Sequence, residues 1–274
     1  MYKQLFGVLA AVVLAATFVA GCGKNSSGQL DAIKKAGEIS IFTNPTFPPY
    51  EFLGKDGAIV GVDIDIAQRV ADKLGVKLNV KNAEFDGIIA AIASGKADMG
   101  ISGFTINEER KQKVDFSVPY VDSVQYLILP EASPIKVLED LAGKNIGGQQ
   151  GTTGYLLVED EINKGVLKDA GVTLKPYNNA PDAVVNLKEG RLAAVVIDEL
   201  VAQQLAKNNP GYIAIPLKFK SGSPVTEQFG VAIAKGNGAL LEVVNEVIKG
   251  MLDDGSLKAA FAKYEKMASE VEKK

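Results

Sequence analysis

The sequence predicts a two-lobed α/β protein with parallel strands. Short strands alternate with amphipathic helices along most of its 274 residues, a pattern typical of layered α/β folds. An apolar strand at 125–129 leads into a segment bounded by Pro130 and Pro134, where we expect the chain to cross into a second lobe. The order helix end, glycine, basic residue and strand occurs twice, at 92–101 and at 187–198.

The composition excludes several classes of function. The chain is 47% hydrophobic and 23% charged, with a net charge of −3 and a pI near 5.3, so no basic surface for nucleic acid is expected. It has no histidine, which rules out serine–histidine triads and histidine-based metal sites. Its single cysteine rules out internal disulfides. We expect a monomer without cofactor or metal.

Residues 1–21 read as a targeting segment. Lys3 is their only charge, and the apolar run at 5–20 is too short and too weakly flanked for a convincing membrane-spanning helix. The run ends in Val-Ala-Gly-Cys, with the cysteine at 22, which resembles the lipobox of bacterial lipoproteins. That resemblance implies cleavage before Cys22 and a lipid on its sulfur. A small, polar linker follows at 22–29.

The globular part opens with a strand at 39–43, directly followed by Asn44. Three prolines within the next stretch, up to Phe52, forbid a helix or a central strand and predict an extended loop. This stiff loop carries Phe47. Its ring either caps the core or faces a ligand, and the residues leave both readings open.

Two helix–strand units follow in the first lobe. Helices are predicted at 63–74 and 86–94, each ended by a glycine, and strands at 76–80 and 97–101. In α/β folds, ligands bind at the carboxyl ends of strands. The segments that follow strands directly are therefore candidate site segments, among them the loop that begins at Ser102.

This loop gathers groups that suit a carboxylate ligand. Gly103 permits close approach of backbone and ligand, and Thr105 adds a hydroxyl. Asn107 is a predicted N-cap for a helix that starts with two glutamates, which places Arg110 in the first turn. The guanidinium fork matches a carboxylate with two hydrogen bonds. The alternative is a surface arginine beside two acidic neighbours.

The second lobe has its own candidate segments. A glycine- and threonine-rich loop at 147–154 precedes a helix at 155–163, so its backbone N–H groups could receive an anion. It matches neither a Walker A motif nor a dinucleotide fingerprint. Asp198 ends a strand and precedes a helix at 199–207, where it is either a ligand group or an ordinary N-cap.

The chain then returns to the first lobe. We expect a single strand at 228–234 and two closing amphipathic helices at 240–252 and 256–271. The predicted organisation is a first lobe made of 30–126 and 224–274 and a second lobe made of 127–223.

In order and spacing, these motifs resemble the polar amino-acid-binding proteins of bacterial ABC importers, the family 3 extracellular solute-binding proteins. The resemblance extends from Leu30 to Lys266. It implies a type II periplasmic binding protein-like fold, with two hinge crossings and the ligand in the interlobe cleft. The matching segments are Asn44–Glu51, Gly61–Asp63, Phe85–Ile88, Gly103–Arg110, Asp115–Ser117, Gly151–Gly154 and Ile197–Asp198.

The resemblance also implies a role for each site residue. Arg110, Thr105, Thr152 and Thr153 would hold the ligand α-carboxylate, and Asp198, Gly103 and Ser102 the α-ammonium. Phe47 and Phe85 would sandwich the ligand side chain, and Asn44, Gln149 and Gln150 would set its specificity. These amides predict glutamine or asparagine as ligand. Arginine is second, because Asn44 replaces the aspartate frequent in relatives that bind basic side chains.

The expected function is that of a lipid-anchored, extracytoplasmic substrate-binding protein at the bacterial cell membrane. It would capture a polar L-amino acid and deliver it to an ABC permease, without being an enzyme. Two alternatives stay open. One is an enzyme on the same scaffold, resembling cyclohexadienyl dehydratases, in which a glutamate or lysine would have to serve as acid. The other is a ligand-sensing module.

The first prediction concerns the anchor. Mature protein should carry lipid on Cys22 and partition into detergent, because two or more acyl chains make membrane attachment stable. Mass spectrometry and detergent partitioning of wild type and Cys22→Ala measure this. A Cys22→Ala protein that stayed lipidated and membrane-bound would contradict the prediction.

Overall fold

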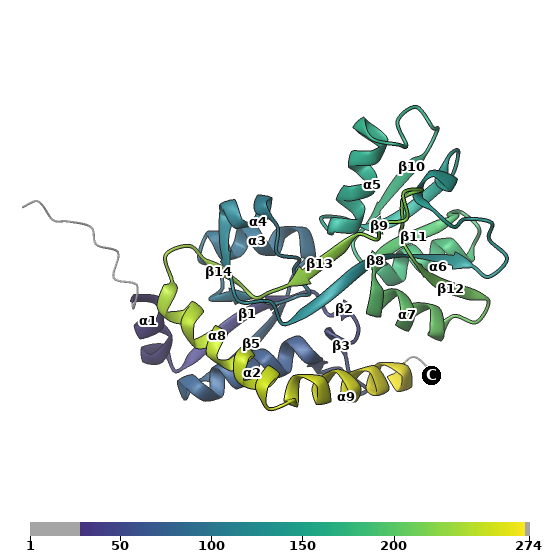
Figure 1. Cartoon of the computed structure of the whole chain (residues 1–274). Coiled ribbons are helices and arrows are strands. Elements are labelled where there is room, and N and C mark those ends of the chain that lie inside the picture. The colour runs from purple at the N-terminus through teal and green to yellow at the C-terminus, as the bar shows by residue number, and fades with distance from the viewer. Residues whose placement is uncertain (1–27, 272–274) are drawn as a thin grey trace, which may run out of the picture.

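The computed structural model describes residues 28–271 and shows two lobes, each built on its own sheet (Figure 1). The predicted two-lobed α/β architecture is therefore confirmed. Within the described residues, no helix is long and apolar enough to cross a membrane. The predicted targeting segment and Cys22 lie outside this range.

The sheet of lobe 1 has the strand order β5-β1-β6-β14-β7. β1 runs parallel to β5 and β6, whereas β14 runs antiparallel to β6 and β7. The strands are β1 (Glu38–Thr43), β5 (Lys77–Asn82), β6 (Met99–Gly100), β7 (Val114–Phe116) and β14 (Ala232–Ala234). The helices of this lobe are α1 (Gly28–Ala36), α2 (Val62–Leu74), α3 (Phe85–Ala93), α4 (Glu108–Lys113), α8 (Gly238–Asp253) and α9 (Ser256–Val271).

Several bounds differ from the prediction, and two of the differences lie in the first part of lobe 1. The linker expected at 22–29 ends earlier, because α1 already begins at Gly28 and buries Ile33. The proline-rich segment is not a plain loop but part of a small antiparallel sheet of β2 (Thr46–Phe47), β3 (Glu51–Leu53) and β4 (Ile59–Val60). The prolines at 48 and 49 lie in the turn between β2 and β3, where no ladder N–H is needed.

The sheet of lobe 2 has the order β10-β9-β11-β8-β12. β10, β9 and β11 run parallel, and β8 is antiparallel to β11 and β12. The elements are β8 (Val121–Pro130), β9 (Asn145–Gln149), β10 (Thr173–Tyr177), β11 (Ala194–Asp198), β12 (Tyr212–Pro216), α5 (Thr153–Lys164), α6 (Ala180–Lys188), α7 (Glu199–Asn208) and the 3-10 helix η1 (Leu138–Leu141). β9 and β11 end at the edge of the sheet that faces lobe 1.

Two paired strands connect the lobes, β8 and β13 (Thr226–Phe229), which lie side by side in Figure 1. The single strand predicted at 228–234 is wrong. It is broken into β13 and β14 because the chain changes partner there, from β8 in the crossing to β6 and β7 in the sheet of lobe 1.

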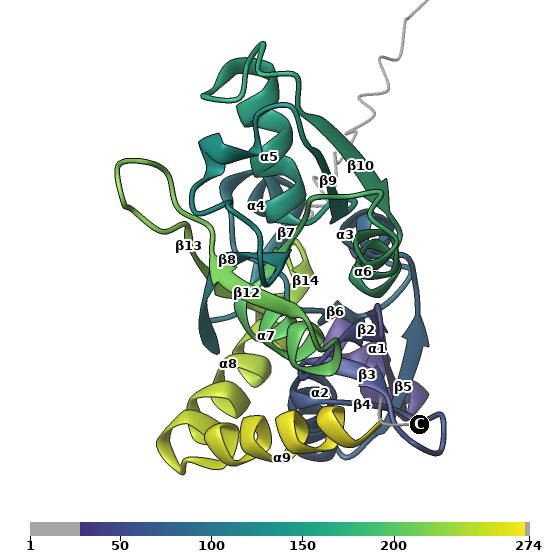
Figure 2. The same ribbon diagram turned by 90° about the vertical axis from the view of Figure 1, so that its right-hand side faces the viewer.

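The lobes also share apolar contacts away from the crossing strands. One continuous cluster of buried side chains includes Phe47 and Val70 of lobe 1 together with Val184 and Leu205 of lobe 2. The end of α9 contacts α7, since the Ser269 hydroxyl donates to Gln204 Oε1 at 3.2 Å. Figure 2 shows α9 running along the base of the molecule.

Candidate functional site

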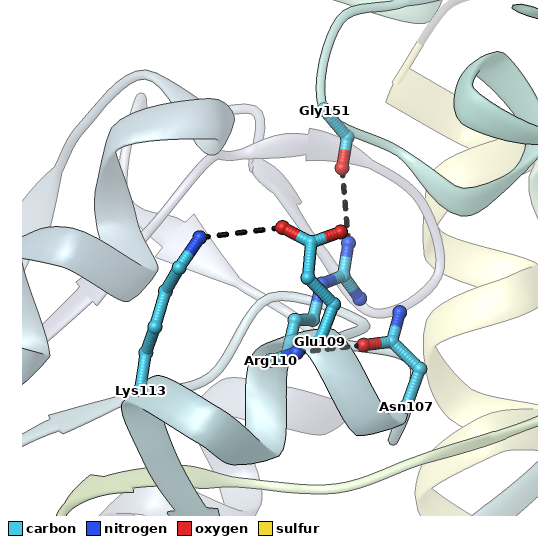
Figure 3. A network of polar contacts seen from close by, with 5 residues as sticks. All are labelled: Asn107, Glu109, Arg110, Lys113 and Gly151. Carbon is cyan, nitrogen blue, oxygen red and sulfur yellow. Dashed lines mark hydrogen bonds and ion pairs between the residues drawn. The ribbon is translucent and has the colours of Figure 1, made fainter.

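Arg110 lies in the first turn of α4, as the sequence predicts. Asn107 is the N-cap of this helix, and its side-chain oxygen accepts a hydrogen bond from the Arg110 backbone N–H at 2.9 Å (Figure 3). Glu109 turns away to the surface and pairs with Lys113 at 3.3 Å. Arg110 is only 7% exposed, so it is not the surface arginine of the alternative reading.

The guanidinium of Arg110 joins the two lobes. Nη1 donates to the carbonyl of Thr105 at 2.9 Å. Nη2 donates to the carbonyl of Gly151 in lobe 2 at 3.0 Å (Figure 3). The Arg110 Cζ atom lies 5.6 Å from the ring centre of Phe85 and 5.4 Å from that of Phe104. Because a guanidinium has five N–H donors, these contacts leave donors for an anion.

Asp198 is a buried acidic side chain of lobe 2. It ends β11 and is 3% exposed, and among the described residues its side chain makes no capping bond to α7. Asp198 therefore occupies the N-cap position of α7, as one of its two readings has it, but its carboxylate accepts from Gln125 Nε2 at 3.0 Å and does not cap the helix. Burial and then the negative charge of Glu227 raise the pKa of Asp198 well above its usual range, and the charge of Arg110 opposes this shift.

Glu227 and Gln125 contact the candidate site residues, and the sequence analysis did not predict them. Glu227 Oε2 accepts hydrogen bonds from the Thr105 hydroxyl at 2.8 Å, the Thr153 hydroxyl at 2.9 Å and Gln125 Nε2 at 3.0 Å. Both residues lie on the crossing strands, β13 and β8. A polar Gln125 at the start of an apolar strand was the only sequence signal available.

Two hydroxyls predicted to contact ligand are used within their own lobes. Thr152 is the N-cap of α5, where it accepts from the Tyr155 backbone N–H and donates to the Gln149 carbonyl at 2.7 Å. The Ser102 hydroxyl donates to Glu51 Oε1 at 2.8 Å and accepts from the Asn44 backbone N–H at 3.0 Å. Both side chains therefore hold neighbouring segments of their own lobe in place.

The amides predicted to set specificity are divided between two places. Gln149 Nε2 donates across the lobes to Asn44 Oδ1 at 3.1 Å, and both side chains are buried. Gln150 is exposed instead and contributes to a cavity between the lobes of about 170 Å³. That cavity is lined by Glu84, Phe85, Asp86, Gln150 and Asn178.

The two aromatic candidates differ in their surroundings. The Phe47 ring packs on Tyr50 and Phe229, with ring centres 5.5 and 6.4 Å apart, which is the core contact of one of its two readings. Gly103 has φ +54° beside this ring, and a Cβ there would lie 2.6 Å from Phe47 Cε1. Phe85 stacks on Phe104 at 4.9 Å and lines the interlobe cavity.

A pair of buried acidic side chains holds the loop at Ser102 and Gly103. Asp63 Oδ2 accepts from the Gly103 backbone N–H at 2.9 Å, and Oδ1 accepts from the Tyr120 hydroxyl at 2.8 Å. Burial raises the pKa of Asp63 to about 6. Burial and then the charge of Asp63 raise the pKa of Glu51 well above its usual range. Within residues 28–271, no group of His, Cys, Asp or Glu side chains is arranged to hold a metal ion.

Comparison with known proteins places this chain in a family. Residues 39–267 match the model of the bacterial extracellular solute-binding proteins, family 3. The chain belongs to this family. Its two-lobed fold is that of the type II periplasmic binding proteins, as the resemblance implied.

Relatives of the chain are amino-acid-binding proteins. The L-cystine-binding protein TcyJ of Escherichia coli strain K12 is 34% identical, over 96% of this chain and 94% of its own. The substrate-binding protein AbpA of an amino acid ABC transporter from Streptococcus pneumoniae Canada MDR_19A, solved with L-arginine, has a TM-score of 0.80 at 31% identity, covering 88% of this chain and 99% of its own. An ancestral arginine-binding protein, solved with glutamine, has a TM-score of 0.74 at 41% identity, covering 83% and 97%. This chain is therefore an amino-acid-binding solute-binding protein of ABC transporters.

The buried acidic pair predicts a pH dependence of stability. Folding raises the pKa of Asp63 from 3.8 to about 6, so between these values the folded protein holds a proton that the unfolded chain has released. The contribution of Asp63 to the free energy of unfolding should fall by about 3 kcal/mol as the pH rises from about 3 to about 7. Urea unfolding of wild type and Asp63→Asn across this range measures the difference.

Glu242→Gln, an exposed change on α8, is the control for this experiment and should follow wild type. If wild type and Asp63→Asn had the same pH slope, the assignment of a raised pKa to Asp63 would be wrong.

Proposed function

We propose that the protein captures a polar L-amino acid in the interlobe cleft and delivers it to an ABC permease. The observation that carries this proposal is a buried cation and a buried acidic side chain, one from each lobe and within electrostatic reach of each other, Arg110 from lobe 1 and Asp198 from lobe 2. A zwitterionic amino acid presents the opposite charge to each of them. Burial of either ligand charge without a partner would cost several kcal/mol.

In this proposal, Arg110 binds the α-carboxylate with the N–H groups that the Thr105 and Gly151 carbonyls leave free. Asp198 binds the α-ammonium through its carboxylate, of which Oδ1 also accepts from Gln125 Nε2. A ligand bound in this way contacts both lobes, and it favours closure by its higher affinity for the closed arrangement.

The charges around the cleft support a basic side chain on the ligand. Asp198 and Glu227 bring two carboxylates against the single guanidinium of Arg110, and two more acidic residues, Glu84 and Asp86, line the interlobe cavity. A cationic ligand would balance this excess, and relatives bound to arginine agree with it. Glutamine and asparagine, which the amide residues indicate, are the alternative. The hydrogen bond between Asn44 and Gln149 occupies the amides that would recognise glutamine or asparagine, so we place arginine first.

The anchor and the location complete the proposal. Lipid on Cys22 would hold the protein at the extracytoplasmic face of the cell membrane. The linker would separate the lobes from the anchor and let them move relative to the membrane. The lobe boundaries near 126 and 223 are part of the same proposal. Relatives named as binding proteins, and the use of Glu51 to hold Ser102, favour binding over catalysis.

A ligand panel tests the identity of the amino acid. Ligand-stripped protein should be stabilised most by L-arginine, because only the native state binds it, by about 2.7 kcal/mol at a hundred times Kd. L-glutamine and L-asparagine should follow. Thermal shift with all twenty amino acids, then calorimetry on the hits, measures this order. Tight binding of glutamate, with none of these three, would reject the charge argument.

Truncation of the two charged residues tests the site. Arg110→Ala and Asp198→Ala should each weaken binding roughly a hundredfold or more, because a ligand charge then stays unpaired at a cost of about 3–5 kcal/mol. Calorimetry gives the affinity, and thermal melting checks that both variants fold. Arg191→Ala removes an exposed arginine of lobe 2 and should bind as wild type does. Wild-type affinity in both cleft variants would refute the assignment.

A further inference from the structure

One side chain on the hinge touches both lobes and both crossing strands. Glu227 belongs to β13, and its Oε2 atom accepts from Thr105 of lobe 1, Thr153 of lobe 2 and Gln125 of β8. The donor–acceptor distances are 2.8, 2.9 and 3.0 Å. A single carboxylate oxygen thus connects four separate parts of the fold.

The hydrogen bonds to Glu227 Oε2 fix the orientation of the groups that donate them. A threonine hydroxyl has one proton, and both Thr105 and Thr153 donate theirs to Glu227 although their own oxygens lie only 3.1 Å apart. The negative charge of Glu227 therefore fixes how both hydroxyls point. Gln125 Nε2 has two protons, which Glu227 and Asp198 accept.

We propose that Glu227 is a positioning residue that clasps the two lobes together from the hinge. It orients the hydroxyls of Thr105 and Thr153 and the amide of Gln125, three groups beside the proposed ligand site. The inference rests on the proposed function only in that it places these three groups beside the proposed ligand site. The clasp itself is made of contacts between protein groups, so it favours the closed arrangement with and without ligand.

Glu227 differs from the other polar contacts between the lobes. The bonds of Arg110 to Gly151 and of Gln149 to Asn44 each join one lobe directly to the other. Glu227 reaches both lobes from the connecting strand, so separation of the lobes must break at least one of its two hydroxyl bonds. Charge-assisted hydrogen bonds are stronger than neutral ones, so a carboxylate suits this role.

Loss of the clasp should change the population of closed protein. Apparent affinity falls in proportion to the fraction of molecules in the binding-competent state. Glu227→Ala should therefore expand the protein in the absence of amino acid and weaken the binding of L-arginine about tenfold. Saturating L-arginine should restore the wild-type radius of gyration. Glu227→Gln keeps the shape but not the charge, and should give a smaller change in the same direction.

Gln228→Ala is the matched control. Gln228 is the next residue on β13, and its exposed side chain donates to Asp122 on β8 at 2.8 Å. This variant removes a contact between the two crossing strands without touching either lobe. Small-angle scattering without and with L-arginine, together with calorimetry, compares all variants of the mature protein with wild type. Gln228→Ala should match wild type in each measurement.

The possible outcomes separate the clasp from the proposed function. A wild-type radius and affinity for Glu227→Ala would overturn the clasp, as would an equal expansion of Gln228→Ala, while amino-acid binding by wild type would still support the proposed function. If wild type bound no amino acid, the proposed function would fail, and the radii without ligand would still test the clasp.

A second variant covers the case in which Glu227→Ala does not fold. Thr153→Val removes the lobe 2 end of the clasp, together with the contacts of the Thr153 hydroxyl with Thr105 at 3.1 Å and with Gln125 Nε2 at 3.4 Å, and keeps the size of the side chain. It should expand the protein without ligand, and in combination with Glu227→Gln its effect should be less than additive, because both changes act on the same bond. Additive effects, or no expansion, would overturn the proposal.

Discussion

The cleft depends on the buried positive charge of Arg110. Removal of a guanidinium from water costs several kcal/mol unless hydrogen bonds and opposite charges replace its hydration. The carbonyl of Thr105 supplies part of this replacement and the carbonyl of Gly151 another part, from the other lobe. Because these acceptors come from both lobes, the charge is fully satisfied only when the lobes lie together. The negative charges of Glu227, on a crossing strand, and of Asp198, in lobe 2, also favour the charged form of Arg110.

The same rule, that buried polar groups need partners, accounts for the surroundings of the site. The loop around Gly103 is held from behind by Asp63, and the hydroxyl of Ser102 is bonded to Glu51. A protonated carboxyl can donate where a carboxylate can only accept, so burial that raises both pKa values lets two acidic groups occupy one apolar region. Glu51 and Asp63 thus support the loop at Ser102 and Gly103.

The local features of the site could be predicted from the sequence, but the distant pairings could not. The Asn107 cap and the position of Arg110 follow from helix geometry over three residues, and the position of Asp198 follows from a strand end. The contact between Thr105 and Glu227 joins residues 122 positions apart. It depends on the pairing of the Thr105 segment with β13, where Thr105 lies opposite Phe229 and the Ile106 N–H donates to the Gln228 carbonyl at 2.8 Å, and no local pattern encodes this pairing. The division of the strand at 228–234 was missed for the same reason, since its two halves pair in different sheets.

The apolar cluster shared by the two lobes has a thermodynamic consequence. Val184 and Leu205 of lobe 2 pack in one cluster with side chains of lobe 1, so separation of the lobes brings part of this surface into contact with water. Exposure of apolar surface raises the heat capacity. Ligand capture that closes the lobes should then carry a negative heat-capacity change larger than a molecule of amino-acid size could produce by its own burial. The temperature dependence of the binding enthalpy thus becomes a measure of how far the lobes move.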